Sequence, residues 1–347
     1  MEMKTDIRSI SLKDIEIFCR NNNMSSFRSK QINEWIWKKR AVSFNEMTSL
    51  SQKSRIILDK HFIIKPVKIN SMQKSIDGTV KYSFKLHDNL MVEGVLIPSK
   101  NRITACISSQ VGCSLTCAFC ATGKLKMKRN LDYPEIYDQV YMLNEEAIKI
   151  FDKPISNIVY MGMGEPLLNY SNLINSIHFI TSNDGLGMSP RRITVSTAGI
   201  AKMIAKLADD NVSVNIAVSL HSAIDNKRNN LMPINEKINL LDLKNSIKYY
   251  YQKTKKRVTY EYILFENIND SIFDAKKLAE FAKISPCKIN IIEYNNVEDT
   301  GFKKTNNKNT ILFIKFLEER NLIVNLRRSK GGDIDAACGQ LINKLNT

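Results

Sequence analysis

The spacing of apolar residues changes along the chain, and each spacing predicts a different kind of structure. In residues 1–64 the spacing is helical, because apolar residues of the stretch SSFRSKQINEWIWKKR fall near one face of a helix: Phe27, Ile32, Trp35 and Ile36. We therefore predict a small helical domain over residues 1–64, with Trp35 in its core.

Residues 65–98 alternate between apolar and polar positions. The stretch TVKYSFKLH has this period of two, which is typical of a half-buried strand. Asp88 and Asn89 then favour a turn, and LMVEGVLIP follows as a second strand. We predict a β-hairpin that links the N-terminal domain to the rest of the chain.

From residue 99 onward, strand-like and helix-like stretches alternate. The predicted strands are 103–109, 156–164, 191–199, 214–221, 257–265 and 288–294, with a further run at 323–329. Predicted helices between them include 134–150, 200–209, 270–283 and 308–320. This order indicates an α/β catalytic domain over 99–347, with a parallel sheet and helices outside it. Six such units would make a partial (β/α)6 barrel, and an open wound sheet is the alternative.

Polar and small residues gather where the predicted strands end. The stretches at these ends read GCSLTCAFC, GMGEP, STAG, SLHS and YNN. In parallel α/β folds the carboxyl ends of the strands carry the chemistry, so these stretches predict one shared site. Ordinary loop composition is the alternative interpretation.

The net charge of the chain indicates a class of binding partner. Lys and Arg number 51 against 35 Asp and Glu, a net charge of +16. The excess favours a polyanion such as a nucleic acid, although a solvated surface would also explain it. Basic stretches recur along the chain, including the predicted helices of 1–64.

The same sequence gives no sign of a membrane or secretion segment. No apolar run approaches the length of a bilayer span, and the first residues are polar. We expect a cytoplasmic protein.

The cysteines point to metal chemistry. There are seven, an odd number that speaks against a disulfide framework. Cys113, Cys117 and Cys120 form the pattern C-x3-C-x2-C. They suit either an iron–sulfur cluster or a zinc ion with Cys106 or Cys338 as fourth ligand.

This pattern, with Phe119 before the last cysteine, resembles the signature of radical S-adenosylmethionine (SAM) enzymes. The stretches SSQVGCSLTCAFCATG, MGMGEPLLN, SPRRITVSTAGI, LMPIN, PCKIN and DIDAACGQL further resemble the RlmN family over nearly the whole chain. One departure is KGGDIDAACGQL, where the family pattern has an acidic residue at one of the glycines, most simply Gly332. The resemblance implies a radical SAM partial barrel with an N-terminal RNA-binding helical domain.

The resemblance also implies the cofactors and the reaction. Cys113, Cys117 and Cys120 would hold one 4Fe–4S cluster, whose open iron binds SAM. Two molecules of SAM would be consumed per turnover to methylate C2 of an adenosine in 23S rRNA and in the anticodon loop of tRNAs. Reductive cleavage of SAM would supply a 5′-deoxyadenosyl radical.

Three further residues match catalytic positions of the family. Cys338 would carry the methyl group as S-methylcysteine, and Cys106 would release the product by forming a transient disulfide with it. Without the resemblance, both would be interpreted as structural cysteines. Glu93 would accept the proton. It is the only charge in LMVEGVLIP, where burial would favour its neutral form, and an ion pair with a lysine is the alternative.

SAM contacts follow from the same resemblance. They are Gly164, Glu165, Ser196, Ser219, Leu220, His221 and Asn295. Without the resemblance, His221 would be interpreted as a structural histidine at the end of a strand, with its ring hydrogen-bonded.

The implied partners are 23S rRNA, tRNA and an electron donor such as flavodoxin, and the protein is expected to be a monomer. Two alternatives stay open at this point. One is methylation of C8 of the same adenosine, as in the related Cfr family. The other is a zinc-stabilised RNA-binding protein without catalysis.

Overall fold

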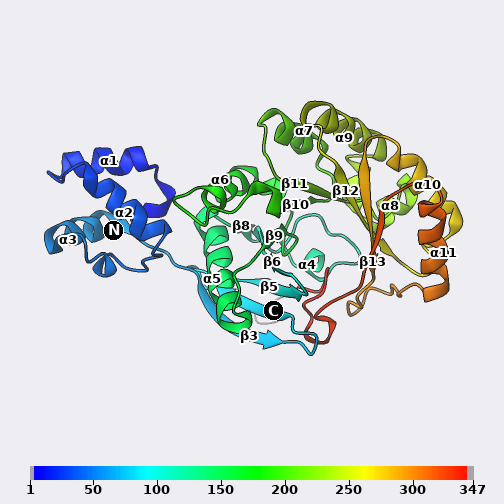
Figure 1. The fold of residues 1–347 in the computed structure, drawn as a ribbon, viewed down its shortest axis with the longest axis horizontal. Helices are drawn as coiled ribbons and strands as arrows, with labels where there is room; N and C mark the ends of the chain where they lie inside the picture. Colours follow the sequence, from blue (N-terminus) through cyan, green and yellow to red (C-terminus); the bar gives the residue numbers. More distant parts are fainter. Residues whose placement is uncertain (1–3, 342–347) are drawn as a thin grey trace.

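A computed structural model describes residues 4–341, and its N-terminal part is a small helical unit (Figure 1). Its helices are α1 (Leu12–Asn21), α2 (Phe27–Trp37) and α3 (Gln52–His61). Strands β1 (Thr5–Asp6) and β2 (Phe62–Ile63) pair in parallel and join the two ends of the unit. Single turns of 3-10 helix, η1 (Ile7–Ser9) and η2 (Phe44–Glu46), complete it.

The prediction that Trp35 lies in the core is wrong. Trp35 is only partly buried, and its Nε1 donates a hydrogen bond to Ser49 Oγ at 2.8 Å. Trp37 is the buried tryptophan, with its ring stacked 3.9 Å from that of Phe179. Phe179 belongs to the catalytic part of the chain, so the local pattern of α2 did not reveal which tryptophan packs.

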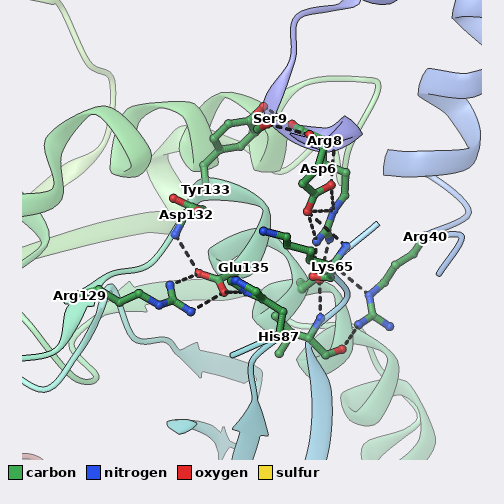
Figure 2. A network of polar contacts seen from close by, with 12 residues as sticks. Asp6, Arg8, Ser9, Arg40, Lys65, His87, Arg129, Asp132, Tyr133 and Glu135 are labelled. Carbon is green, nitrogen blue, oxygen red and sulfur yellow. Dashed lines mark hydrogen bonds and ion pairs between the residues drawn. The ribbon is translucent and has the colours of Figure 1, made fainter. Parts of the chain in front are cut away.

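A buried ionic network fixes the helical unit against helix α5 (Tyr133–Phe151), as Figure 2 shows in part. Arg8 Nη1 lies 2.8 Å from Asp138 Oδ2, and Arg40 Nε lies 3.2 Å from Asp138 Oδ1. The amide of Val67 also donates to Asp138, at 3.0 Å. A carboxylate that is 1 % exposed is tolerated because each oxygen has a partner. The network therefore sets the orientation of the N-terminal unit.

One ten-stranded sheet runs through the rest of the described residues, in the order β14-β13-β12-β11-β10-β9-β6-β5-β4-β3. Its parallel strands are β6 (Arg102–Cys106), β9 (Asn157–Tyr160), β10 (Ile193–Thr197), β11 (Asn215–Ser219), β12 (Val258–Leu264), β13 (Cys287–Glu293) and β14 (Val324–Arg327). Most apolar residues of the strands from β6 to β12 are buried, as expected for strands covered on both faces, whereas the edge strand β14 is partly exposed.

Helices connect these strands and lie on the outside of the curved sheet (Figure 1). They are α5, α6 (Tyr170–Thr181), α7 (Ala201–Asp209), α9 (Leu240–Thr254), α10 (Ile272–Ala282) and α11 (Asn307–Glu318). Two short helices lie in the connections, α4 (Ala121–Lys124), which faces the inside of the curve, and α8 (Asp225–Leu231). Short 3-10 turns are η3 (Pro166–Asn169), η4 (Pro190–Arg192), η5 (Pro233–Glu236) and η6 (Gly332–Ile334). The predicted partial (β/α)6 barrel is confirmed, with β14 added after the sixth unit.

The predicted hairpin strands are part of this same sheet. They are β4 (Val80–Lys85) and β5 (Met91–Ser99), and a strand that the sequence did not predict, β3 (Lys68–Lys74), precedes them. Strand β3 pairs antiparallel with β4, β4 with β5 and β5 with β6. The division into 1–64, 65–98 and 99–347 stays a prediction, and residues 1–3 and 342–347 of it lie outside the described part. Among residues 4–341, no helix combines the length and apolarity needed to cross a bilayer.

Candidate active site

A cavity of about 430 Å³ lies at the carboxyl ends of the parallel strands. It brings together the strand-end stretches that the sequence singled out. The predicted site residues in its lining are Cys106, Cys113, Cys117, Cys120, Gly164, Glu165, Ser196, Ser219, His221, Asn295 and Cys338. Leu220 and Glu93 are not among the lining residues and are considered separately below.

The three clustered cysteines lie on the loop between β7 (Gln110–Val111) and α4. Phe119 anchors this loop in an apolar cluster, with its ring 5.4 Å from Phe265 and 4.9 Å from His221. The amide of Ala118 donates to the carbonyl of Leu231 at 3.0 Å. Phe119 is buried, and Cys113, Cys117 and Cys120 all line the cavity.

Burial keeps the three thiols in their neutral, protonated form. Burial raises the pKa of Cys113 to about 11, and it also raises the pKa values of Cys117 and Cys120. Metals bind thiolates, so loading a metal centre here would release protons.

The donor set fits an iron–sulfur cluster. Within residues 4–341, no three His, Cys, Asp or Glu side chains converge closely enough to share a single ion. In a 4Fe–4S cluster each cysteine binds a different iron, so three thiols need only surround a common space. The loop supplies three thiols and no carboxylate.

Gly164 and Glu165 follow strand β9. Gly164 has a φ of +94°, and a Cβ there would lie 2.4 Å from Gln110 Cβ, so the position requires glycine. The carboxylate of Glu165 accepts the amides of Leu167 at 3.0 Å and Ala198 at 2.7 Å. Burial nevertheless raises its pKa to about 7. A carboxylate in this position can bind an ammonium group that enters the cavity.

His221 is satisfied by the backbone and also lines the cavity. The amide of Ile263 donates to its Nδ1 at 3.1 Å, and burial lowers its pKa to about 3. The ring is therefore neutral at physiological pH. Leu220 is fully buried outside the lining, and its carbonyl accepts a hydrogen bond from Arg228 Nε at 3.1 Å.

Cys338 reaches the cavity from the C-terminal loop. Its carbonyl accepts a hydrogen bond from Asn295 Nδ2 at 3.4 Å, and the next residue, Gly339, accepts from the amide of Ala121 at 2.7 Å. The second bond ties the loop directly to the residue that follows Cys120. Burial raises the pKa of Cys106 to about 12, and desolvation inside the cavity also raises that of Cys338, although Cys338 as a residue remains exposed. Both thiols are thus protonated until a reaction partner or a nearby cation favours the thiolate.

Glu93 lies on the face of the sheet that forms the interior of the barrel. Its strand neighbour Val95 pairs with Cys106, and residues two apart share a face of a strand. Glu93 is 5 % exposed and forms an ion pair of 3.6 Å with Lys81, as the alternative interpretation foresaw. Lys81 also donates to the carbonyl of Asp335 at 3.5 Å, so the pair adjoins the loop of Cys338.

Sequence reasoning missed a buried polar group inside the barrel. Glu261 on β12 accepts from Asn290 Nδ2 at 2.8 Å and lies 3.4 Å from Arg327 Nη1. Burial raises the pKa of Glu261, and Arg327 opposes this shift. Arg327 in turn favours the thiolate forms of Cys106 and Cys338. Glu261 is a lone charge in an apolar strand, the same signal that drew attention to Glu93.

Two family models match this chain. Residues 107–279 match the radical SAM superfamily, and residues 5–64 match the ribosomal RNA large subunit methyltransferase N-terminal domain. The first range contains the three clustered cysteines, and the second contains the helical unit.

Relatives match over almost the entire chain. Proteins named as probable dual-specificity RNA methyltransferase RlmN are 51% identical in Christiangramia forsetii, covering 99% of this chain and 97% of the relative, and 53% identical in Cytophaga hutchinsonii, covering 98% and 93%. The crystal structure of a radical SAM methyltransferase from Sphaerobacter thermophilus superposes with a TM-score of 0.91 at 33% identity, covering 97% of this chain and 99% of that one. The chain is therefore a radical SAM enzyme and belongs to the RlmN family.

Proposed function

We propose that this protein is an RNA methyltransferase that methylates C2 of an adenosine in 23S rRNA and of an adenosine in the anticodon loop of tRNAs. One observation carries the proposal: Cys338, Cys106 and the three clustered cysteines line a single cavity. A metal site alone would give no reason for the two additional thiols. Both are needed if one thiol carries a methyl group and the other removes the product.

The cluster and SAM, when bound, would supply a 5′-deoxyadenosyl radical, a species able to activate an unreactive methyl group. Cys113, Cys117 and Cys120 would hold the cluster. Glu165 would bind the ammonium group of SAM, and Gly164 leaves room for the backbone to approach it. Ser196, Ser219, His221 and Asn295 line the remaining wall of the cavity, where SAM would lie.

Cys338 would first take a methyl group on its sulfur, because the thiolate is a strong nucleophile. Arg327 favours that thiolate. The deoxyadenosyl radical would remove a hydrogen atom from this methyl group, and the resulting carbon radical would add to C2 of adenine. The adduct would then lose one electron to the oxidised cluster and the proton from C2 to Glu93.

Cys106 completes the reaction. Its thiolate attacks the sulfur of Cys338, the bond between that sulfur and the carbon breaks, and the electron pair leaves with the carbon. The carbon takes up a proton and becomes the methyl group of the product. A disulfide remains between Cys106 and Cys338, and an external thiol must reduce it.

RNA fits the charge of this protein. The net charge is +16, and Arg102, Arg328 and Lys330 are basic residues in the lining of the cavity. A base must leave its stack to enter such a cavity, so a flipped or unpaired adenosine is expected. Binding should weaken strongly with salt. The electron donor, the monomeric state and the cytoplasmic location stay predictions.

Nucleoside analysis tests this proposal. RNA treated with cluster-loaded protein, SAM and a reductant should contain 2-methyladenosine by mass spectrometry. Finding 8-methyladenosine instead would establish the chemistry of the Cfr family. A colourless protein that carries zinc and produces neither nucleoside would contradict the proposal.

A further inference from the structure

The turn between β3 and β4 holds the loop that carries Cys338. Ser75 Oγ donates to Asp333 Oδ1 at 2.6 Å, and the amide of Ile76 donates to Asp333 Oδ2 at 3.2 Å. In the opposite direction, the amide of Gly331 donates to Asp77 Oδ2 at 2.9 Å. These partners are more than 250 residues apart in the sequence. Figure 1 shows the C-terminal loop beside the end of β3.

Asp77 connects the turn and the loop through its two oxygens. Oδ1 accepts the amide of Thr79 at 2.9 Å, which shapes the turn, and Oδ2 accepts Gly331. Burial alone would raise the pKa of Asp77, but hydrogen bonds from Thr79, Gly331 and Ser75 outweigh it and hold the pKa at about 2. The carboxylate is therefore charged, and strong as an acceptor, across the physiological range.

The loop is tight on the side that faces the turn. Gly331 has a φ of +70°, and a Cβ there would lie 2.9 Å from Thr79 Cγ2 and 2.9 Å from Ala336 Cβ. The amide of Ala336 donates back to the carbonyl of Gly331 at 2.9 Å. Lys330 Nζ donates to the carbonyl of Pro98 at 2.7 Å. Each of these contacts involves a residue at most eight positions before Cys338.

We propose that Asp333 and Asp77 are positioning residues, which hold Cys338 at the place where its sulfur meets Cys106. This role rests on the proposed function, because it matters only if the two thiols react with each other. Asp333 is exposed, so replacing it should change the overall stability little. A role in positioning and a role in folding can therefore be separated.

Thiol–disulfide exchange measures this positioning directly. Cluster-loaded protein is treated anaerobically with oxidised glutathione, which forms a mixed disulfide with the accessible Cys338 and releases one glutathione. Cys106 then attacks that mixed disulfide, forms the bond to Cys338 and releases the second glutathione. Together the two thiols lose two electrons and two protons, which the two glutathiones carry away. Peptide mass spectrometry distinguishes the mixed from the internal disulfide, counting only Cys338 that carries no methyl group.

The decisive variant is Asp333→Ala. We expect its internal disulfide to form about tenfold more slowly than in the wild type, so that glutathione stays on Cys338, because small displacements strongly reduce reactions between held groups. Asp333→Asn keeps an acceptor oxygen and should recover part of the rate. Ile76→Ala is the matched control in the same turn, since that side chain is 98% exposed and points away from the loop. Iron content and melting temperature should be unchanged in all three.

A wild-type rate in Asp333→Ala would overturn the proposal, and so would an equal loss of rate in Ile76→Ala. If Asp333→Ala melts at a lower temperature, Ser75→Ala removes one of the two hydrogen bonds to Asp333, together with the bond from the amide of Asp77 to Ser75 Oγ, and should still slow the reaction. A wild-type rate in that variant would likewise overturn the proposal. The assay needs neither SAM nor RNA. A wild type that makes no 2-methyladenosine would therefore refute the proposed function and leave the exchange result standing.

Discussion

The cavity holds its sulfur atoms in two different ways. Cys113, Cys117 and Cys120 lie on one short loop, which is held by the apolar packing of Phe119 against Phe265 and by the hydrogen bond from Ala118 to Leu231. Cys338 lies on a loop fixed by residues from distant parts of the chain, among them Asp77 and Asn295. The first arrangement suits a permanent ligand set. The two loops share the hydrogen bond from Ala121 to Gly339, but the contacts with Asp77 and Asn295 belong to the Cys338 loop, which suits a sulfur that must change its bonding partner in each turnover.

The largest expected effect concerns the short loop. Cys117→Ala should abolish the iron–sulfur cluster, because two remaining thiols are too few to hold it. Methyl transfer should then fall below detection, and Cys338 should carry no methyl group. Iron and sulfide analysis with visible absorption measures the loss. Cys287→Ala is the control, since Cys287 lies on β13 outside the cavity lining. A full complement of iron in Cys117→Ala would refute the assignment of ligands.

Replacing Cys338 or Cys106 should leave the iron–sulfur cluster in place and stop product formation. Cys338→Ala and Cys106→Ala should keep the iron content of the wild type and lose product formation by about 10³-fold or more, since each removes an atom that forms a covalent bond. Cys106→Ala should also accumulate protein bound covalently to RNA. In wild-type protein isolated from cells, peptide mass spectrometry should find S-methylation at Cys338 and not at Cys19 or Cys287. Loss of iron in both variants would instead indicate that these thiols are ligands.

The sequence predicted the short-range features of the molecule best. The parallel strands were recognisable because strands covered on both faces are continuous apolar runs. The rule that chemistry gathers at their carboxyl ends accounts for nine of the predicted site residues in the cavity. The cluster cysteines were recognisable because their spacing is local. Resemblance, and not spacing, singled out Cys106 and Cys338.

Features that depend on distant contacts were not predictable in this way. In the sequence, Glu261 is a single charged residue among apolar ones. Its partner Arg327 lies 66 residues further along, so no local pattern connects the two. Asp333 and Ser75 are polar residues of ordinary turns until the fold brings them together. Trp37, and not Trp35, stacks on Phe179 from another part of the chain, and the sequence around the two tryptophans does not reveal this difference.

A smaller effect, on the pH dependence of stability, is expected from His221, whose ring packs against Phe119 of the cluster loop. Its ring is neutral in the folded protein, with a pKa of about 3, whereas the unfolded chain takes up a proton below its ordinary value of 6.5. Its contribution to the free energy of unfolding is therefore present above pH 6.5 and is lost as the pH falls towards 3. At pH 5 the loss should be about 2 kcal/mol.

The measurement compares unfolding at pH 5 and pH 7.5. His221→Asn should lose less stability between these two pH values than the wild type does, because it has no group that titrates there. His178→Asn replaces an exposed histidine and should keep the pH dependence of the wild type. Equal pH dependence in His221→Asn and the wild type would show that another group causes the acid sensitivity.

The smallest effect concerns the backbone of the Cys338 loop. Gly331→Ala places a Cβ at a φ of +70°, 2.9 Å from Thr79 and Ala336, which should destabilise the loop by about 1–2 kcal/mol. Gly332→Ala is the control in the adjacent position, where a Cβ meets nothing within 4 Å. Hydrogen–deuterium exchange at the amide of Ala336, which donates to Gly331, should be about tenfold faster in the first variant and unchanged in the second. Exchange at the amide of Ala118 on the cluster loop should be unaffected in both, because this amide donates to Leu231 and not to the Cys338 loop. Faster exchange on both loops in Gly331→Ala would mean that the two sets of sulfur atoms are not held independently.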